Sequence, residues 1–142
     1  MRSLEQIALG ARAAWRTPAI ISHGLTELLE APSAARVRNG ADPRLAVRAA
    51  YAAIARMARI APTRWRNTCL YRSVAECLVL RAHGLPARVV IGVGTSGDEA
   101  DVIAHAWVEC EGVECLSTRG QAELETMTLR STRVGVPLDG ER

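Results

Sequence analysis

The sequence predicts an α+β domain in which a helical half is followed by a small antiparallel sheet. Apolar residues recur at helical spacing up to His83, and β-branched residues and glycines take over from Pro86. A chain of 142 residues, 49% of them hydrophobic, is long enough for one core and too short for two ordinary domains. We therefore expect one domain over 1–142. Its parts are a helical part over 1–60, a catalytic core over 61–120 and a polar tail over 121–142.

The first helices are expected in residues 1–30, where the apolar positions include Leu4, Ile7 and Trp15. The Thr17-Pro18 step predicts a break that leaves two short amphipathic helices, with proline at the start of the second. The stretch APSAARVRNGADP carries turn residues and predicts a surface connection.

Two further helices follow this connection. Leu45 to Ile60 is rich in alanine, with apolar residues three and four apart, and Pro62 ends the helix. The next helix begins near Cys69 with Thr68 as its cap and ends at His83-Gly84. Its apolar stripe predicts a central helix packed on a sheet.

The strands are expected in the second half of the chain. ARVVIGVG reads as a strand, GTSGDEAD as a polar loop, and VIAHAWVEC with EG and VECLST as a hairpin. The tail from Gly120 to Arg142 is polar, with weak signals for one element near Leu124 to Leu129.

Charge and composition exclude several classes of function. The formal net charge is +3, and the arginines are scattered without a dense basic block, so nucleic-acid binding is not predicted. No apolar run is long enough to cross a bilayer, and the opening MRSLEQ lacks the features of a secretory signal. We expect a cytoplasmic protein without membrane contact, in which the four cysteines are reduced thiols.

Cys69 and His105 are the candidates for chemistry. A cysteine becomes a strong nucleophile when a neighbouring base or a helix N-terminus favours its thiolate. Cys69 is expected at a helix N-terminus, where its backbone N–H also helps to bind an oxyanion. His105 is expected in mid-strand on the face shared with Trp107 and Glu109, from which an inward-facing imidazole meets the helix end.

Each residue alone also has a plain structural interpretation. A single cysteine is usually a small buried hydrophobe, and a single strand histidine is usually structural. The order of elements favours a catalytic role for both residues: a cysteine at the start of a central helix, a strand, a loop, then a histidine in mid-strand. His23 and His83 lack that setting, and His83 suits the C-terminal end of a helix.

At these residues the sequence resembles a known family. The run CLYRSVAECLVLRAHGLPARVVIGVG, followed by AHAWVECEGVECL, resembles the transglutaminase-like peptidase that removes the leader from lasso-peptide precursors. The resemblance covers roughly residues 62–118. It implies a transglutaminase-like or papain-like core, with Cys69 as nucleophile and His105 as general base. It also implies a precursor leader peptide as substrate, a separate small leader-binding protein and an ATP-dependent lasso cyclase as partners, and no cofactor or metal.

The third catalytic member departs from the family pattern. The family places an acidic residue about a dozen positions after the histidine, and this sequence has Ser117 there. If Cys110-Glu111-Gly112 forms the hairpin loop, Ser117 lies opposite His105 and orients the ring through its hydroxyl. Glu109, Glu114 and Asp101 are the alternatives.

Further candidates surround the pair. Trp107 either lines a substrate groove or belongs to the core. Arg72 binds a peptide carbonyl or braces its helix, and Asn67 donates an oxyanion hydrogen bond or forms a turn. Cys77 is expected in the core. Cys110 and Cys115 lack metal-ligand spacing, so no zinc site is expected.

Two alternative functions stay open on the sequence. One is a non-catalytic scaffold with the same fold that holds the precursor, favoured by Ser117 in place of the acid. The other is a cysteine acyltransferase or amidase acting on another peptide, because Cys69 and His105 do not fix the acyl acceptor.

Overall fold

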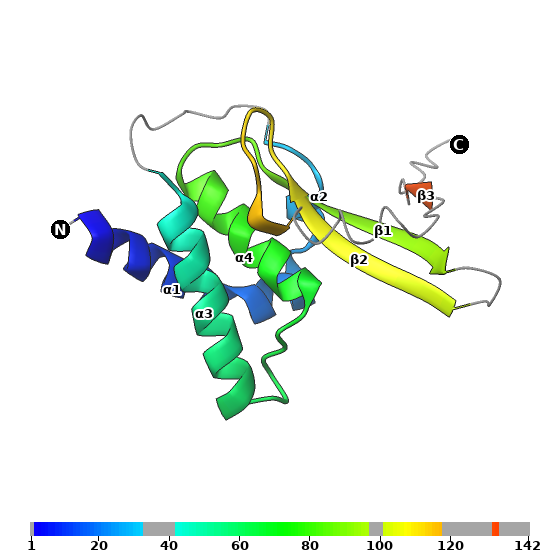
Figure 1. The fold of residues 1–142 in the computed structure, drawn as a ribbon, viewed down its shortest axis with the longest axis horizontal. Helices are drawn as coiled ribbons and strands as arrows, with labels where there is room; N and C mark the ends of the chain where they lie inside the picture. Colours follow the sequence, from blue (N-terminus) through cyan, green and yellow to red (C-terminus); the bar gives the residue numbers. More distant parts are fainter. Residues whose placement is uncertain (1, 33–41, 97–100, 118–131, 134–142) are drawn as a thin grey trace.

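Over the residues that the structure describes, the fold combines four helices with a small antiparallel sheet (Figure 1). A computed structural model describes residues 2–32, 42–96, 101–117 and 132–133, with the backbone alone at 2, 93–96, 101–103 and 132–133. In these ranges the helices are α1 (Arg2–His23), α2 (Thr26–Leu29), α3 (Arg44–Ile60) and α4 (Cys69–Ala82), and the strands are β1 (Arg88–Ser96), β2 (Asp101–Glu109) and β3 (Thr132–Arg133). The α+β prediction is confirmed.

Helix α4 lies at the centre, as the sequence predicts. One face packs with α1 and α3 in a cluster rich in alanine, and the other packs with α2, β1 and β2. Val79 belongs to the first cluster, and Val74, Cys77 and Leu80 to the second. The position of Cys69 is therefore fixed by a helix held on both sides.

The predicted break at Thr17-Pro18 is wrong, because α1 continues through Pro18 to His23. The proline removes one backbone donor, but Ala13, Ala14 and Thr17 are buried in the interior. The Thr17 hydroxyl also donates to the Ala13 carbonyl at 3.0 Å. Packing thus outweighs the local cost of the proline, and the chain turns only near Gly24.

Helices α1 and α3 approach each other closely at Gly10, which is buried. A Cβ atom built there meets the Ala46 carbonyl oxygen and stands 2.9 Å from the Ala49 Cβ. We expect Gly10→Ala to lower the free energy of unfolding by about 3 kcal/mol, although alanine is the better helix former. Gly24→Ala is the matched control, since its Cβ would meet nothing nearer than 3.6 Å. Urea unfolding of both variants checks this, and equal stabilities would contradict the close approach.

The sheet has the order β2-β1-β3 with antiparallel neighbours. ARVVIGVG and VIAHAWVE are strands as predicted, but they pair with each other, with Gly92 opposite His105. The predicted hairpin of β2 with VECLST is wrong. Glu111 and Gly112 do form a turn, with Gly112 at φ +73°, but the described residues after it form no strand. The element expected near 124–129 lies outside the described residues.

Candidate active site

Cys69 is the first residue of α4, in agreement with the sequence. Thr68 occupies the N-cap position in an extended conformation, but its side chain makes no capping hydrogen bond. The first backbone N–H groups of a helix have no partner within the helix, so this end favours negative charge. Cys69 is half-buried, and its sulfur thus stands at the positive end of the helix dipole near the surface.

His105 lies in the middle of β2, on the strand face that carries Trp107 and Glu109. The His105 and Trp107 rings stack with centroids 5.9 Å apart, and the Trp107 indole N–H donates to Glu109 at 3.3 Å. The intervening Ala106 and Val108 are buried, and Val108 packs with residues of α4. The shared face is as predicted, but it is the other strand face that packs on α4.

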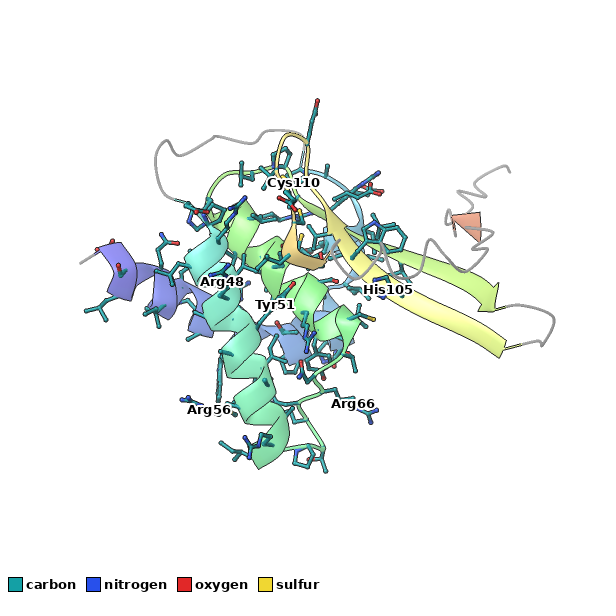
Figure 2. The ribbon with its side chains drawn as sticks, viewed as in Figure 1. Arg48, Tyr51, Arg56, Arg66, His105 and Cys110 are labelled. Atoms are coloured by element: carbon teal, nitrogen blue, oxygen red, sulfur yellow. The ribbon has the colours of Figure 1, made fainter. Side chains whose placement is uncertain are left out.

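Helix α4 meets β2 directly beside these two residues. The Ser73 hydroxyl donates to the Ala106 carbonyl at 2.9 Å, and it also lies 2.8 Å from the Cys69 carbonyl. Ser73 is one helical turn after Cys69, and Ala106 is the residue after His105. The contact therefore anchors the two candidate residues to each other through the backbone, at the end of α4 that Figure 2 shows near the labelled His105.

No direct hydrogen bond links the two side chains. The His105 Nε2 atom is buried without a hydrogen-bond partner among the described residues. Burial lowers the pKa of His105 below its ordinary value of 6.5. The imidazole is therefore neutral near pH 7, the form in which it accepts a proton.

Ser117 does not lie across a hairpin from His105, contrary to the prediction. Its hydroxyl accepts a hydrogen bond from the Val108 backbone N–H at 2.9 Å. Val108 N–H and the Ala106 carbonyl both point away from β1, along the open edge of β2. Ser117 and Ser73 thus cover this edge together, and no hydrogen bond connects Ser117 with the imidazole within the described part of the chain.

Glu76 organises the segment that carries Ser117. This carboxylate is 1% exposed and accepts hydrogen bonds from the backbone N–H groups of Leu116 at 2.6 Å and Ser117 at 3.0 Å. The Tyr51 hydroxyl of α3 donates to it at 2.7 Å. Burial, followed by the charge of Glu76, raises the pKa of Tyr51, so its hydroxyl stays a donor. This network was not predicted, although a glutamate within the apolar stripe of α4 is a signal for it.

Three further candidates have defined contacts. Trp107 covers Gly92, where a Cβ atom would stand 2.8 Å from the indole ring. The Arg72 guanidinium donates to the Asn67 side-chain oxygen at 2.8 Å and lies over the Tyr51 ring. Asn67 and Arg72 therefore brace each other across the start of α4, and both are exposed.

The acidic alternatives to Ser117 are also located. Glu109 binds Arg88 at 2.7 Å, and Glu114 lies 3.9 Å from Arg44. Asp101 is the first residue of β2 and only its backbone is described. Neither glutamate is hydrogen-bonded to the buried Nε2 atom of His105.

The other three cysteines are poor nucleophiles. Burial raises the pKa of Cys77 to about 11 and that of Cys115 to about 12. Burial also raises the pKa of Cys110, and the nearby charges of Glu111 and Glu76 add to this shift. These shifts disfavour the thiolate at all three residues, and Cys69 is the cysteine that begins a helix, so it is the candidate nucleophile.

Two cavities lie at the turn after β2, away from Cys69 and His105. The larger, of about 520 Å³, is lined by residues that include Arg88, Cys110 and Cys115, and the smaller, of about 310 Å³, includes Glu76. Within the described ranges no cluster of three or more His, Cys, Asp or Glu side chains is arranged to hold a metal ion. None of the helices described has the length and apolar character to cross a membrane.

Comparison with known proteins assigns the family. Residues 6–128 match the family described as the transglutaminase-like superfamily, whose members are typically cysteine-dependent peptidases or transferases. No curated protein and no solved structure matches the chain. The matched range includes Cys69 at the start of α4 and His105 on β2. Since the match extends over most of its length, the chain belongs to the transglutaminase-like superfamily.

Proposed function

We propose that this protein is a cysteine peptidase that removes the leader peptide from a lasso-peptide precursor. One observation carries the proposal: Cys69 begins the central helix, one turn from the Ser73 contact with the residue next to His105. The raised pKa values of the other three thiols support Cys69 as the nucleophile. The CL-x-RS and AHAWVE motifs support lasso-peptide precursors as the substrate class.

The reaction is amide hydrolysis through a thioester. His105 takes the proton of the Cys69 thiol, and the sulfur attacks the scissile carbonyl carbon. The Cys69 backbone N–H stabilises the resulting oxyanion, and its collapse expels the amine, which takes the proton from His105. Water then attacks the thioester, giving its proton to His105, and the leader carboxylate leaves as the thiol re-forms. Catalytic hydrogen bonds are often long or poorly aligned without substrate, so the pair forms its contact transiently in the free protein and holds it in the complex.

Ser73 and Ser117 act in this proposal as positioning residues. Both bind the open edge of β2 on either side of Trp107, and they thereby set the distance of His105 from α4. Trp107 restricts the orientation of the His105 imidazole by stacking on it. Arg72 and Asn67 line the substrate-binding site beside Cys69. The partners are a separate leader-binding protein and an ATP-dependent cyclase, in the cytoplasm.

Mass spectrometry of a lasso-peptide precursor incubated with this protein and the leader-binding protein tests the function. We expect wild-type protein to release the leader, and His105→Ala to release none in the same time. Ser117→Ala should slow release about tenfold, because it loosens β2 without removing a reacting group. A precursor that stays bound but uncleaved by the wild type would contradict the peptidase and favour the scaffold. Cleavage of unrelated peptides with no preference for the precursor would favour a general amidase.

A further inference from the structure

The surface of α3 and of the segment around the start of α4 is rich in arginine. Between Asp42 and Glu76 the sequence has seven arginines and no acidic residue. All seven are exposed. Of these seven, only Arg44 lies within ion-pair distance of an acidic side chain in the described part of the chain, at 3.9 Å from Glu114. We call the other six the arginine track: Arg48, Arg56, Arg59, Arg64, Arg66 and Arg72.

The α3 members of the track share one side of the helix. The buried residues of α3 include Ala46, Val47, Ala50 and Ile54, which fill the core. Arg48, Arg56 and Arg59 are exposed on the opposite side by helical spacing. Figure 2 shows Arg48 and Arg56 on α3, and Arg66 on the segment that leads from α3 to α4. The exposed arginines thus follow the chain from α3, through the connecting segment, to the start of α4.

The track ends at the candidate nucleophile. Arg66 precedes Cys69 by three residues, and Arg72 follows it by three, within the first turn of α4. Arg72 is held by Asn67 and by the Tyr51 ring, so its charge stays beside the start of α4. A guanidinium has a planar set of donors that matches a carboxylate, and an unneutralised row of them attracts an acidic chain.

We infer that the arginine track binds acidic side chains of an extended peptide and directs that peptide to Cys69. The inference rests on the proposed function and names its substrate class: peptides with glutamate or aspartate close to the scissile bond. A peptide fits the track better than a nucleic acid, because bases need exposed aromatic faces for stacking. Three aromatic residues lie in the segment that carries the track. Tyr51 is covered by Arg72 and bound to Glu76, Trp65 is 3% exposed, and Tyr71 is half-buried with its hydroxyl bound to the Arg64 carbonyl. Trp15 of α1 is exposed and lies against Trp65, but a single exposed ring gives no platform on which successive bases stack.

Fluorescence anisotropy with Cys69→Ala protein, which cannot cleave, tests the binding. The probe is a fluorescein-labelled Glu-Gly repeat peptide, compared with a Gln-Gly repeat of the same length. We expect the Glu-Gly peptide to bind at least about tenfold more tightly at low salt and to lose this advantage as the salt concentration rises. Arg56→Glu with Arg66→Glu should weaken its binding at least about tenfold.

Arg12→Glu with Arg16→Glu is the matched control, because it changes the net charge equally. Both residues are exposed on the side of α1 opposite the buried Ala13 and Ala14, away from α3. Equal binding of the two peptides, or an equal loss in both double variants, would overturn the inference. Tighter binding of polyuridylate to the same arginines would also overturn it and indicate a nucleic-acid surface.

The two proposals fail separately. Glu-Gly binding by the track without precursor cleavage would keep the acidic docking surface and remove the peptidase. Precursor cleavage by wild-type protein without Glu-Gly binding would keep the peptidase and remove the docking surface.

Discussion

Cys69→Ala is expected to reduce the rate of leader release by at least about a thousandfold. The variant removes the sulfur that forms the thioester, and only binding and the oxyanion contact remain. Its fold should be unchanged, since Cys69 is half-buried and no hydrogen bond of its thiol is found among the described residues. Single-turnover measurements on the precursor give the rate of leader release, and circular dichroism checks that the variant is folded.

Cys110→Ala is the matched control for this prediction. Cys110 is also half-buried, but burial raises the pKa of its thiol and it lies away from His105. We expect its rate to stay within about twofold of the wild type. The double variant of Cys69→Ala with His105→Ala should be no slower than Cys69→Ala alone, because the pair acts as one unit. A Cys69→Ala protein that keeps wild-type activity would rule out Cys69 as the nucleophile.

Glu76→Ala is expected to lower the free energy of unfolding by about 3 kcal/mol or more. It leaves the backbone N–H groups of Leu116 and Ser117 and the Tyr51 hydroxyl without their acceptor in the interior. Tyr51→Phe removes only one of these hydrogen bonds and should cost about 1 kcal/mol. Urea unfolding of the two variants measures both values.

Glu76→Gln separates the role of the charge from that of the shape. The glutamine keeps one acceptor oxygen, but its NH2 group replaces the other oxygen and faces a hydrogen-bond donor. We expect its loss of unfolding free energy to lie between those of Glu76→Ala and Tyr51→Phe. A Glu76→Ala protein as stable as Tyr51→Phe would show that this network does not hold the segment after β2.

The helices and strands that carry the site were accessible from the sequence because their signals are local. Alanine-rich periodicity predicts α3, and the start of α4 at Cys69 follows from the irregular segment before it. The β-branched run of β1 and the alternation of β2 likewise depend on neighbouring residues alone. The wrong predictions occur where the structure depends on packing between segments that are distant in the sequence. Pro18 stays helical because α1 is buried on its neighbours, a contact that no local pattern records.

The site was only partly predictable for the same reason. Cys69 and His105 stand out by residue type and context, but the position of Ser117 depends on how the chain continues after Gly112. A second strand would have placed Ser117 opposite His105. Instead Glu76, forty residues earlier in the chain, binds the backbone of this segment and turns the Ser117 hydroxyl towards Val108. Such a long-range contact to a buried charge leaves no periodic signal in the sequence.

The rate of alkylation of Cys69 by iodoacetamide, followed by peptide mapping across the pH range, tests the central claim most directly. A neutral His105 accepts the thiol proton, so the wild type should react rapidly at neutral pH. Since burial lowers the pKa of His105, the rate should fall only below pH 6.5, as the imidazole becomes protonated. In His105→Ala this fast reaction should be lost, while His23→Ala should keep it. Identical pH profiles in the wild type and His105→Ala would contradict the account, because Cys69 would then react without His105.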